Sequence, residues 1–213
     1  MTALAFAERP ADGEPEGLLL LHHGRGSNEP DVLALAGALD PDRRLHIAAP
    51  RAPLQLPGSP GYHWYVVARV GFPDAVTFAG AFTALADFHD EIWERTGVGP
   101  ERTVLGGFSM GAVMSYALGL AGERPAPAGV LAFSGFIPTV DGWQPDLESR
   151  PQLPVLIAHG DHDPAIEIGF AHTARDLLVA AGLPVSYHEF GGGHEIARDH
   201  LAAAAGWLGQ VLG

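Results

Sequence analysis

The chain has 213 residues, no cysteine and a formal net charge of −13 at pH 7, and every basic residue other than histidine is an arginine. This length predicts a single domain, residues 1–213, with a substantial buried core. The acidic balance argues against a nucleic-acid partner. The absence of cysteine and lysine excludes disulfides, thiolate catalysis, cysteine-ligated zinc and catalytic lysines.

The first 16 residues are polar and contain Pro, Asp, Gly and Glu, so they predict a flexible or hairpin-like entry segment. The N-terminus lacks a basic region followed by a sustained apolar stretch, and no run approaches the ~18 apolar residues of a membrane span. We therefore expect a cytoplasmic protein without stable membrane insertion.

Strands and helices are expected to alternate along the rest of the chain. Strands are predicted at 17–21, 45–49, 102–107, 128–133, 154–158 and 184–190, and helices at 30–39, 77–96, 112–120, 165–181 and 195–211. Asn28 is placed to cap the first helix, and residues 62–72 fit a strand or a loop equally well. This alternation is typical of parallel βαβ units and therefore of the α/β class.

A Gly-x-Ser-x-Gly sequence lies between a predicted strand and a predicted helix. Its residues run from Gly107 to Gly111 around Ser109. In that context the pattern predicts a nucleophile elbow, a tight turn that exposes the serine and leaves no room for side chains at the glycines. Ser115 and Ser134 are other candidate serines, but neither lies in such a turn.

An activated serine needs a histidine to take its proton and a carboxylate to orient that histidine. Among the eleven histidines, His194 follows a Gly-rich stretch at a strand end and precedes the last helix. Asp161 and Asp163 both lie in the loop after strand 154–158 and compete for the role of the acid. This loop also holds metal-ligand residue types, but no helix offers a partner pair with His-x-x-x-His spacing, so no metal or cofactor is expected.

Five stretches together resemble the phospholipase/carboxylesterase family of α/β-hydrolases, the small esterases that include the acyl-protein thioesterases. These stretches are Leu21-His-His-Gly-Arg-Gly-Ser, Gly106-Gly-Phe-Ser-Met-Gly, Ala132-Phe-Ser-Gly, His159-Gly-Asp-His-Asp-Pro and Gly193-His-Glu-Ile. The resemblance implies an α/β-hydrolase fold: a mostly parallel central sheet, helices on both faces and no cap domain. It also favours Asp163 over Asp161 as the acid.

The resemblance assigns roles around the serine as well. It implies that the backbone N–H groups of Arg25 and Met110 form the oxyanion hole. It also implies that the aromatic pair Trp64-Tyr65 lines the acyl pocket, with Phe72 and Phe136 as further wall residues. For these aromatic residues, packing in the core is the competing interpretation.

These observations together predict a serine carboxylic ester hydrolase with Ser109, His194 and Asp163 as its triad, acting on short- to medium-chain acyl esters. An acyl thioesterase or a lysophospholipase with the same triad is an alternative. A non-catalytic ligand-binding protein on a hydrolase scaffold is the alternative from another class. The expected partner is a small acyl ester or thioester, and the chain is expected to be a monomer or a homodimer.

Overall fold

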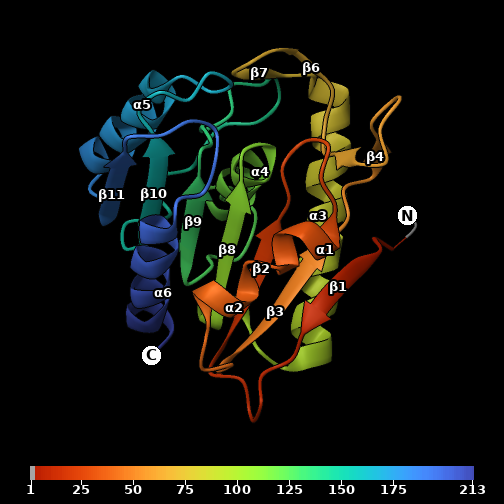
Figure 1. Ribbon diagram of the computed structural model, residues 1–213, viewed down its shortest axis with the longest axis vertical. Helices are drawn as coiled ribbons and strands as arrows, with labels where there is room; N and C mark the ends of the chain where they lie inside the picture. Colours follow the sequence, from red (N-terminus) through yellow and green to blue (C-terminus); the bar gives the residue numbers. More distant parts are fainter. Residues whose placement is uncertain (1–2) are drawn as a thin grey trace.

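The computed structural model describes residues 3–213, which build a seven-stranded sheet with helices on both faces (Figure 1). The strand order is β1-β3-β2-β8-β9-β10-β11, and all neighbours pair in parallel except β1 and β3. The strands of this sheet are β1 (Phe6–Arg9), β2 (Gly17–His22), β3 (Leu45–Pro50), β8 (Thr103–Phe108), β9 (Gly129–Phe133), β10 (Val155–Gly160) and β11 (Val185–Phe190).

Strand β1 corrects the expectation of a flexible or hairpin-like entry over residues 1–16. Its four residues pair antiparallel with β3 at the edge of the sheet. The ring of Phe6 packs 5.4 Å from that of Phe88, and Arg9 forms an ion pair with the buried Asp40. These partners lie far along the chain. The strand therefore forms because of its pairing with β3 and its tertiary contacts, and its own composition does not predict it.

Alternate residues of the strands supply the two faces of the sheet. In β2, Leu18 and Leu20 pack in the cluster that holds α3 and α4, whereas Leu19 and Leu21 pack in the cluster that holds α1, α2 and α6. The helices are α1 (Glu29–Leu33), α2 (Ala36–Leu39), α3 (Ala75–Thr96), α4 (Met110–Gly119), α5 (Ile168–Ala180) and α6 (Arg198–Leu212). The five inner strands of the central sheet are therefore largely apolar and buried, whereas the edge strands β1 and β11 are only partly buried.

The predicted helices are confirmed, with one division. The expected helix over 30–39 is split into α1 and α2, and Asn28 caps α1 by accepting a hydrogen bond from the amide of Asp31 at 2.9 Å. Helix α3 begins at its cap Asp74, which accepts from the amide of Thr77, and ends at Gly97 with φ +68°. A left-handed residue of this kind ends a helix without the steric cost that a side chain would bring.

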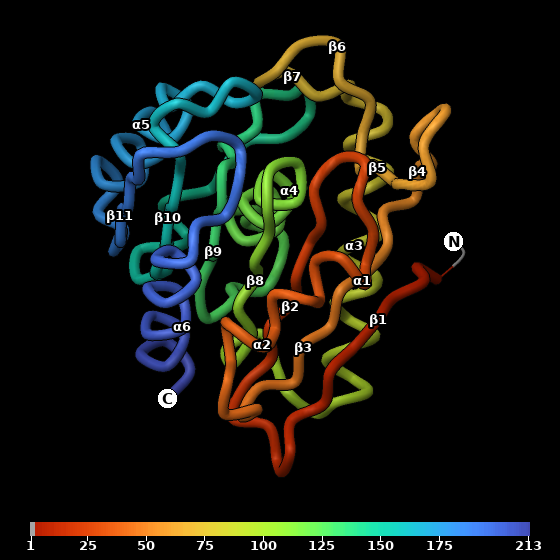
Figure 2. Tube along the Cα trace, viewed as in Figure 1, coloured from red at the N-terminus to blue at the C-terminus, as the bar shows by residue number. Residues whose placement is uncertain are grey.

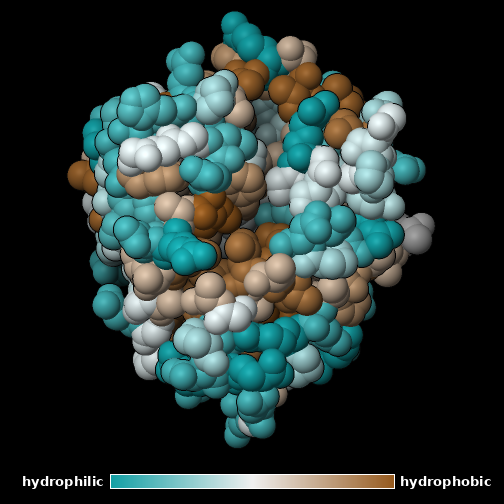
Figure 3. Space-filling model, in the orientation of Figure 1, coloured by the Kyte–Doolittle hydropathy of each residue, from teal (hydrophilic) through white to brown (hydrophobic). Residues whose placement is uncertain are grey.

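Residues 62–72, which the sequence left undecided, belong to two short hairpins. Strand β4 (Leu54–Gln55) pairs with β5 (Tyr62–His63), and β6 (Val67–Arg69) pairs with β7 (Phe72–Pro73). The β6–β7 hairpin lies at the top of the molecule in Figure 1, beyond the carboxyl ends of the central strands. Hydrophobic residues gather in this part of the surface in the same view (Figure 3).

The loops that follow β2, β8, β10 and β11 all leave from the same end of the sheet, at the carboxyl ends of the strands, because these strands are parallel. The chain trace shows the long loop after β11 running back toward the junction of β8 and α4 (Figure 2). Open α/β sheets bind their ligands at this end, beyond the carboxyl ends of the strands. Within residues 3–213, no helix combines the length and apolar composition that crossing a membrane would require.

Candidate active site

Ser109 lies between the last residue of β8 and the first residue of α4. Its backbone is held at φ 56° and ψ −120°, a conformation that non-glycine residues rarely adopt. A Cβ atom at Gly107 would clash with the backbone of Gly111, and one at Gly111 would clash with the carbonyl oxygen of His22. The turn therefore requires both glycines, and it holds the serine side chain out at the end of the strand.

The side chain of His194 contacts both Ser109 and Asp163. Its Nε2 lies 2.8 Å from Ser109 Oγ, and its Nδ1 lies 2.6 Å from Asp163 Oδ2. Because the carboxylate accepts, Nδ1 carries the proton and Nε2 is left to accept from the serine hydroxyl. The side chain of Asp163 is fully buried, whereas 23% of the His194 side chain is exposed. The three residues come from the ends of β8, β10 and β11.

Two backbone amides hold the carboxylate of Asp163. Its Oδ1 accepts hydrogen bonds from the amides of Ala165 and Ile166, each at 2.8 Å. Burial alone would raise the pKa of this carboxyl, but the amide of Ile166, the side chain of His194 and the amide of Ala165 outweigh it and bring the pKa below its ordinary value. Asp163 is therefore an ionised and immobile partner for His194.

Asp161 lies in the same loop but faces another way. Its Oδ1 contacts Nδ1 of His162 at 2.5 Å and accepts from the amide of Gly192 at 3.1 Å. The bond from Gly192 ties the loop after β10 to the loop after β11. The structure thus brings Asp163 to His194 and uses Asp161 to hold the two loops together.

Arg25 lies in the loop after β2 and Met110 is the first residue of α4, and both line the same cleft as Ser109. Neither amide donates a hydrogen bond to any acceptor within residues 3–213. An amide at the first turn of a helix has no partner within that helix and is favourably placed for an anion. The two free N–H groups are therefore available for an oxygen that develops negative charge beside Ser109.

The loop that carries Arg25 is fixed on both sides. Nε2 of His23 accepts from the amide of Ala52 at 3.0 Å, and Nδ1 of His23 donates to the carbonyl of Gly24 at 2.8 Å. The amide of Gly26 donates to the carbonyl of Tyr62 at 2.8 Å. The position of the Arg25 amide is thus set by β3 and by the β4–β5 hairpin.

A cleft of about 470 Å³ opens beside Ser109. Its wall includes Tyr65, Phe72 and Phe136, three of the residues that the sequence suggested for an acyl pocket. Sequence reasoning missed the other wall residues, among them Val67, Arg69, Val70 and Ile166. The apolar residues of the β6–β7 hairpin are a signal in the sequence that could have indicated this wall. The structure shows that they are exposed, and exposed apolar residues mark binding surfaces.

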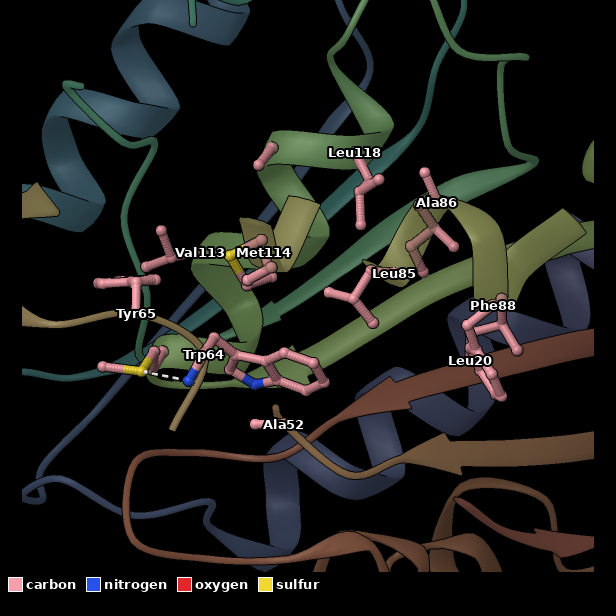
Figure 4. Packing of buried hydrophobic residues seen from close by; sticks show 14 of the residues in the cluster. Leu20, Ala52, Trp64, Tyr65, Leu85, Ala86, Phe88, Val113, Met114 and Leu118 are labelled. Carbon is pink, nitrogen blue, oxygen red and sulfur yellow. Dashed lines mark hydrogen bonds between the residues drawn. The ribbon is translucent and has the colours of Figure 1, made fainter. Parts of the chain in front are cut away.

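Trp64 is absent from this wall, which corrects its assignment to the acyl pocket. Its side chain is fully buried in the cluster with Leu20 and Leu85 (Figure 4). Its indole N–H donates to the carbonyl of His23 at 2.9 Å, and its amide donates to Met110 Sδ at 3.3 Å. Packing and these bonds direct the ring inward, so Trp64 supports the loop and the serine turn from below.

A buried chain of polar side chains lies beneath the serine turn, and sequence reasoning missed one of its three members, His89. Ser115 donates to the carbonyl of Gly111 at 3.0 Å, so Nδ1 of His22 donates to Ser115 Oγ at 2.8 Å. Nε2 of His22 then accepts from Nε2 of His89 at 3.1 Å. Burial lowers the pKa of His22 to about 3, and it lowers the pKa of His89 well below its ordinary value. Both imidazoles are therefore neutral and join β2, α3 and α4.

Within residues 3–213, no group of three or more His, Asp or Glu side chains is arranged to hold a metal ion. The loop with His159, Asp161, His162 and Asp163, whose residue types suggested a metal site as an alternative, forms no such group. Nε2 of His159 donates instead to the carbonyl of Ile166 at 2.8 Å.

Known proteins resemble this chain in fold and in sequence. The crystal structure of esterase PE8 superimposes with a TM-score of 0.83 at 31% identity, covering 99% of this chain and 100% of that one. Acyl-protein thioesterase 1 of Neurospora crassa is 32% identical over 140 residues, which is 63% of this chain and 57% of that protein. Esterase YpfH of Escherichia coli is 29% identical over 184 residues, covering 83% of this chain and 75% of that protein.

The chain spans little more than half the length of the Neurospora crassa relative, but it spans esterase PE8 throughout. These similarities confirm the α/β-hydrolase fold that the sequence predicted. The description of the phospholipase/carboxylesterase family matches the chain over residues 5–212. The chain therefore belongs to the phospholipase/carboxylesterase family.

Proposed function

We propose that the protein is a serine carboxylic ester hydrolase that acts on short- to medium-chain acyl esters. The observation that carries the proposal is the continuous chain of hydrogen bonds from Ser109 Oγ through His194 to the buried carboxylate of Asp163. Such a chain activates a hydroxyl that is otherwise a poor nucleophile. The esterases among the relatives are consistent with it.

The first half of the reaction forms an acyl-enzyme. Ser109 Oγ attacks the ester carbonyl carbon while His194 Nε2 takes the hydroxyl proton, and Asp163 stabilises the resulting imidazolium. The carbonyl oxygen becomes negative and accepts hydrogen bonds from the free amides of Arg25 and Met110. Removal of one such donor typically costs about 3 kcal/mol of transition-state stabilisation. The imidazolium then gives its proton to the departing alcohol oxygen as the carbon–oxygen bond breaks.

The second half repeats these roles with water. His194 takes a proton from a water molecule, whose oxygen attacks the acyl carbon of the Ser109 ester. Collapse of the tetrahedral intermediate returns the proton to Ser109 Oγ and releases the carboxylic acid. The free enzyme is regenerated with no net change in its protonation.

The size of the cleft supports short and medium acyl chains. Its volume of about 470 Å³ is in the range of sites that hold small organic ligands. Phe136, only 5% exposed, lies in its wall and packs 5.2 Å from the ring of Phe170. An acyl chain would gain ~0.8 kcal/mol for each methylene buried against the apolar wall.

Thioester hydrolysis is a second candidate, because the matching Neurospora crassa protein is named an acyl-protein thioesterase. The same steps apply to a thioester, with a thiol in place of the alcohol as the leaving group. The open mouth of the cleft at the β6–β7 hairpin is compatible with a bulky leaving group that remains outside.

Ester turnover by two serine variants tests the proposal. Ser109→Ala should lower kcat/KM on 4-nitrophenyl butyrate by ~10⁴-fold or more, because the nucleophile is lost. Ser134→Ala is the matched control: its buried hydroxyl has no hydrogen-bond partner within the described residues, so its removal should leave turnover intact. If Ser109→Ala kept a tenth of wild-type activity, the nucleophile would lie elsewhere.

A further inference from the structure

Most arginine side chains of this protein are already paired. Outside Arg25, Arg69 and Arg198, each arginine donates to a carboxylate or to backbone carbonyls of the described residues. The side chains of those three make no hydrogen bond or ion pair with any part of residues 3–213. In a chain of net charge −13, an unpaired guanidinium is the exception.

Two of these three arginines, Arg25 and Arg69, line the cleft beside Ser109. No Asp or Glu is among the residues that line it in the described chain. Two like charges that face one cleft repel each other, and nothing in the wall offsets them. The cleft is therefore electropositive on a strongly acidic molecule, and it lacks the counter-ion that the other arginines have.

Arg69 is held in a defined position although it is exposed. Its guanidinium lies over the ring of Phe72, 3.8 Å from the ring centre. Stacking on an aromatic face orients the planar group and leaves its edge N–H groups free to donate. Arg25 lines the same cleft from another element, the loop after β2. The cleft wall thus receives one arginine from the β6–β7 hairpin and one from this loop.

The other side of His194 has the opposite charge. A second surface hollow there is lined by Asp31 and Glu195 and by no arginine. The charge distribution across Ser109 and His194 is thus asymmetric, with cations on the side of the cleft and carboxylates on the far side. A substrate with an anionic end would be directed toward the cleft and repelled from the second hollow.

Resting on the ester hydrolase activity proposed above, we infer that the cleft binds esters that carry an additional anionic group, such as a free carboxylate, with Arg69 and Arg25 as its counter-ions. A guanidinium matches a carboxylate in shape and donates two parallel hydrogen bonds to it. The anionic group belongs to the part of the ester that occupies the cleft.

Two matched pairs of esters test this inference. The first pair is the 4-nitrophenyl half-ester of adipic acid and 4-nitrophenyl hexanoate, which differ by a carboxylate on the acyl side. The second pair is 4-acetoxybenzoate and its methyl ester, which differ by a carboxylate on the leaving group. The readout is the ratio of kcat/KM for the anionic ester to that for the neutral ester.

In wild type, at least one pair should show a ratio of roughly ten in favour of the anion, the scale of a charge-assisted hydrogen bond near a surface. The pair that shows it tells which side of the ester occupies the cleft. Arg69→Gln and Arg25→Gln should each lower that ratio by about threefold. Arg198→Gln, the matched control, removes an unpaired arginine outside the cleft and should leave the ratio as in wild type. Ionic strength near ~1 M should reduce the wild-type ratio.

The outcomes separate this inference from the function on which it rests. Hydrolysis of the neutral esters with ratios of one or less in both pairs would overturn the inference and leave the hydrolase intact. A preference for the anion that survives both Arg69→Gln and Arg25→Gln would also overturn it. If wild type hydrolysed none of the four esters, the proposed function itself would fail, and the inference with it.

Discussion

The strand-end loops around Ser109 and the segment from 54 to 73 both border the cleft, but they are held in different ways. Asp163 is fully buried and fixed by two amides, and Ser109 is fixed by a turn that admits only glycine on both sides. In the segment 54–73, the four strands are only two or three residues long, and Val66 and Phe72 are 46% and 44% exposed.

This difference suggests that the strand-end loops carry out the chemistry, whereas the segment 54–73 sets which substrate is preferred. The reacting groups must hold distances of hydrogen-bond length, so they come from the most rigid part of the molecule. The β6–β7 hairpin has fewer buried contacts and only has to present Arg69 and Phe72 to the substrate. Substitutions in the first region should lower the rate for every ester, whereas those in the hairpin should change which ester is preferred.

The largest expected effect separates the two aspartates of one strand-end loop. Asp163→Asn should lower kcat by ~10⁴-fold, because an amide no longer holds His194 in the tautomer that accepts the serine proton. Asp161→Asn keeps an acceptor for the amide of Gly192, so its kcat should stay within about twofold of wild type. Steady-state kinetics on folded variants, checked by circular dichroism, measures both. A larger loss for Asp161→Asn would reverse the assignment.

Trp64 lies in the core beneath the cleft, whereas Phe136 lies in the cleft wall. Trp64→Ala should lower the free energy of unfolding by about 3–5 kcal/mol and reduce turnover of acetate and octanoate esters alike, because Trp64 packs in the core. Phe136→Ala should lower kcat/KM for octanoate by roughly tenfold relative to acetate, because only the longer chain reaches that wall. Chemical denaturation and a two-ester assay give the two readouts. Equal losses on both esters for Phe136→Ala would place this ring outside the acyl site.

A smaller effect concerns the histidines beneath the serine turn. Their pKa values are lowered in the folded protein, so the unfolded chain takes up protons first as the pH falls below ~6.5. Their contribution to stability is complete above that pH. Below it, each histidine should cost about 1.4 kcal/mol per pH unit until its folded pKa is reached.

The double variant His22→Leu/His89→Leu should flatten this decline between pH 6.5 and pH 4.5, measured by urea unfolding. Both partners of the buried bond are replaced together, so no polar atom is left unpaired at that bond, and Ser115 keeps its bond to Gly111. The exposed His162→Gln is the matched control and should decline as wild type does. A double variant that declines as steeply as wild type would show that other groups set the acid limit.

The sequence predicted the elements whose signals are local. Helix α3 could be placed from its repeating apolar residues, and the turn at Ser109 from two glycines at fixed spacing between a strand and a helix. The loops with Asp163 and His194 followed in the same way, since each comes after a predicted strand. That the three side chains meet depends on the parallel order of the strands, which the βαβ alternation implies.

The parts that escaped prediction depend on contacts between distant residues. β1 exists because it pairs with β3, and the two hairpins of segment 54–73 are too short to show periodicity. Trp64 and Tyr65 are adjacent, aromatic and both buried in the core, yet only Tyr65 also lines the cleft. The chain of His89, His22 and Ser115 links three elements, so no spacing in the sequence indicates it.

The central claim is that His194 and Asp163 activate the hydroxyl of Ser109, and labelling by a fluorophosphonate tests it most directly. Wild-type protein should gain one phosphonyl group, and peptide mapping by mass spectrometry should locate it on the peptide that holds Ser109. His194→Gln should remain folded and label far more slowly, because the serine then lacks its base. An unlabelled wild-type protein, a label on another residue, or equal labelling of His194→Gln would contradict the account.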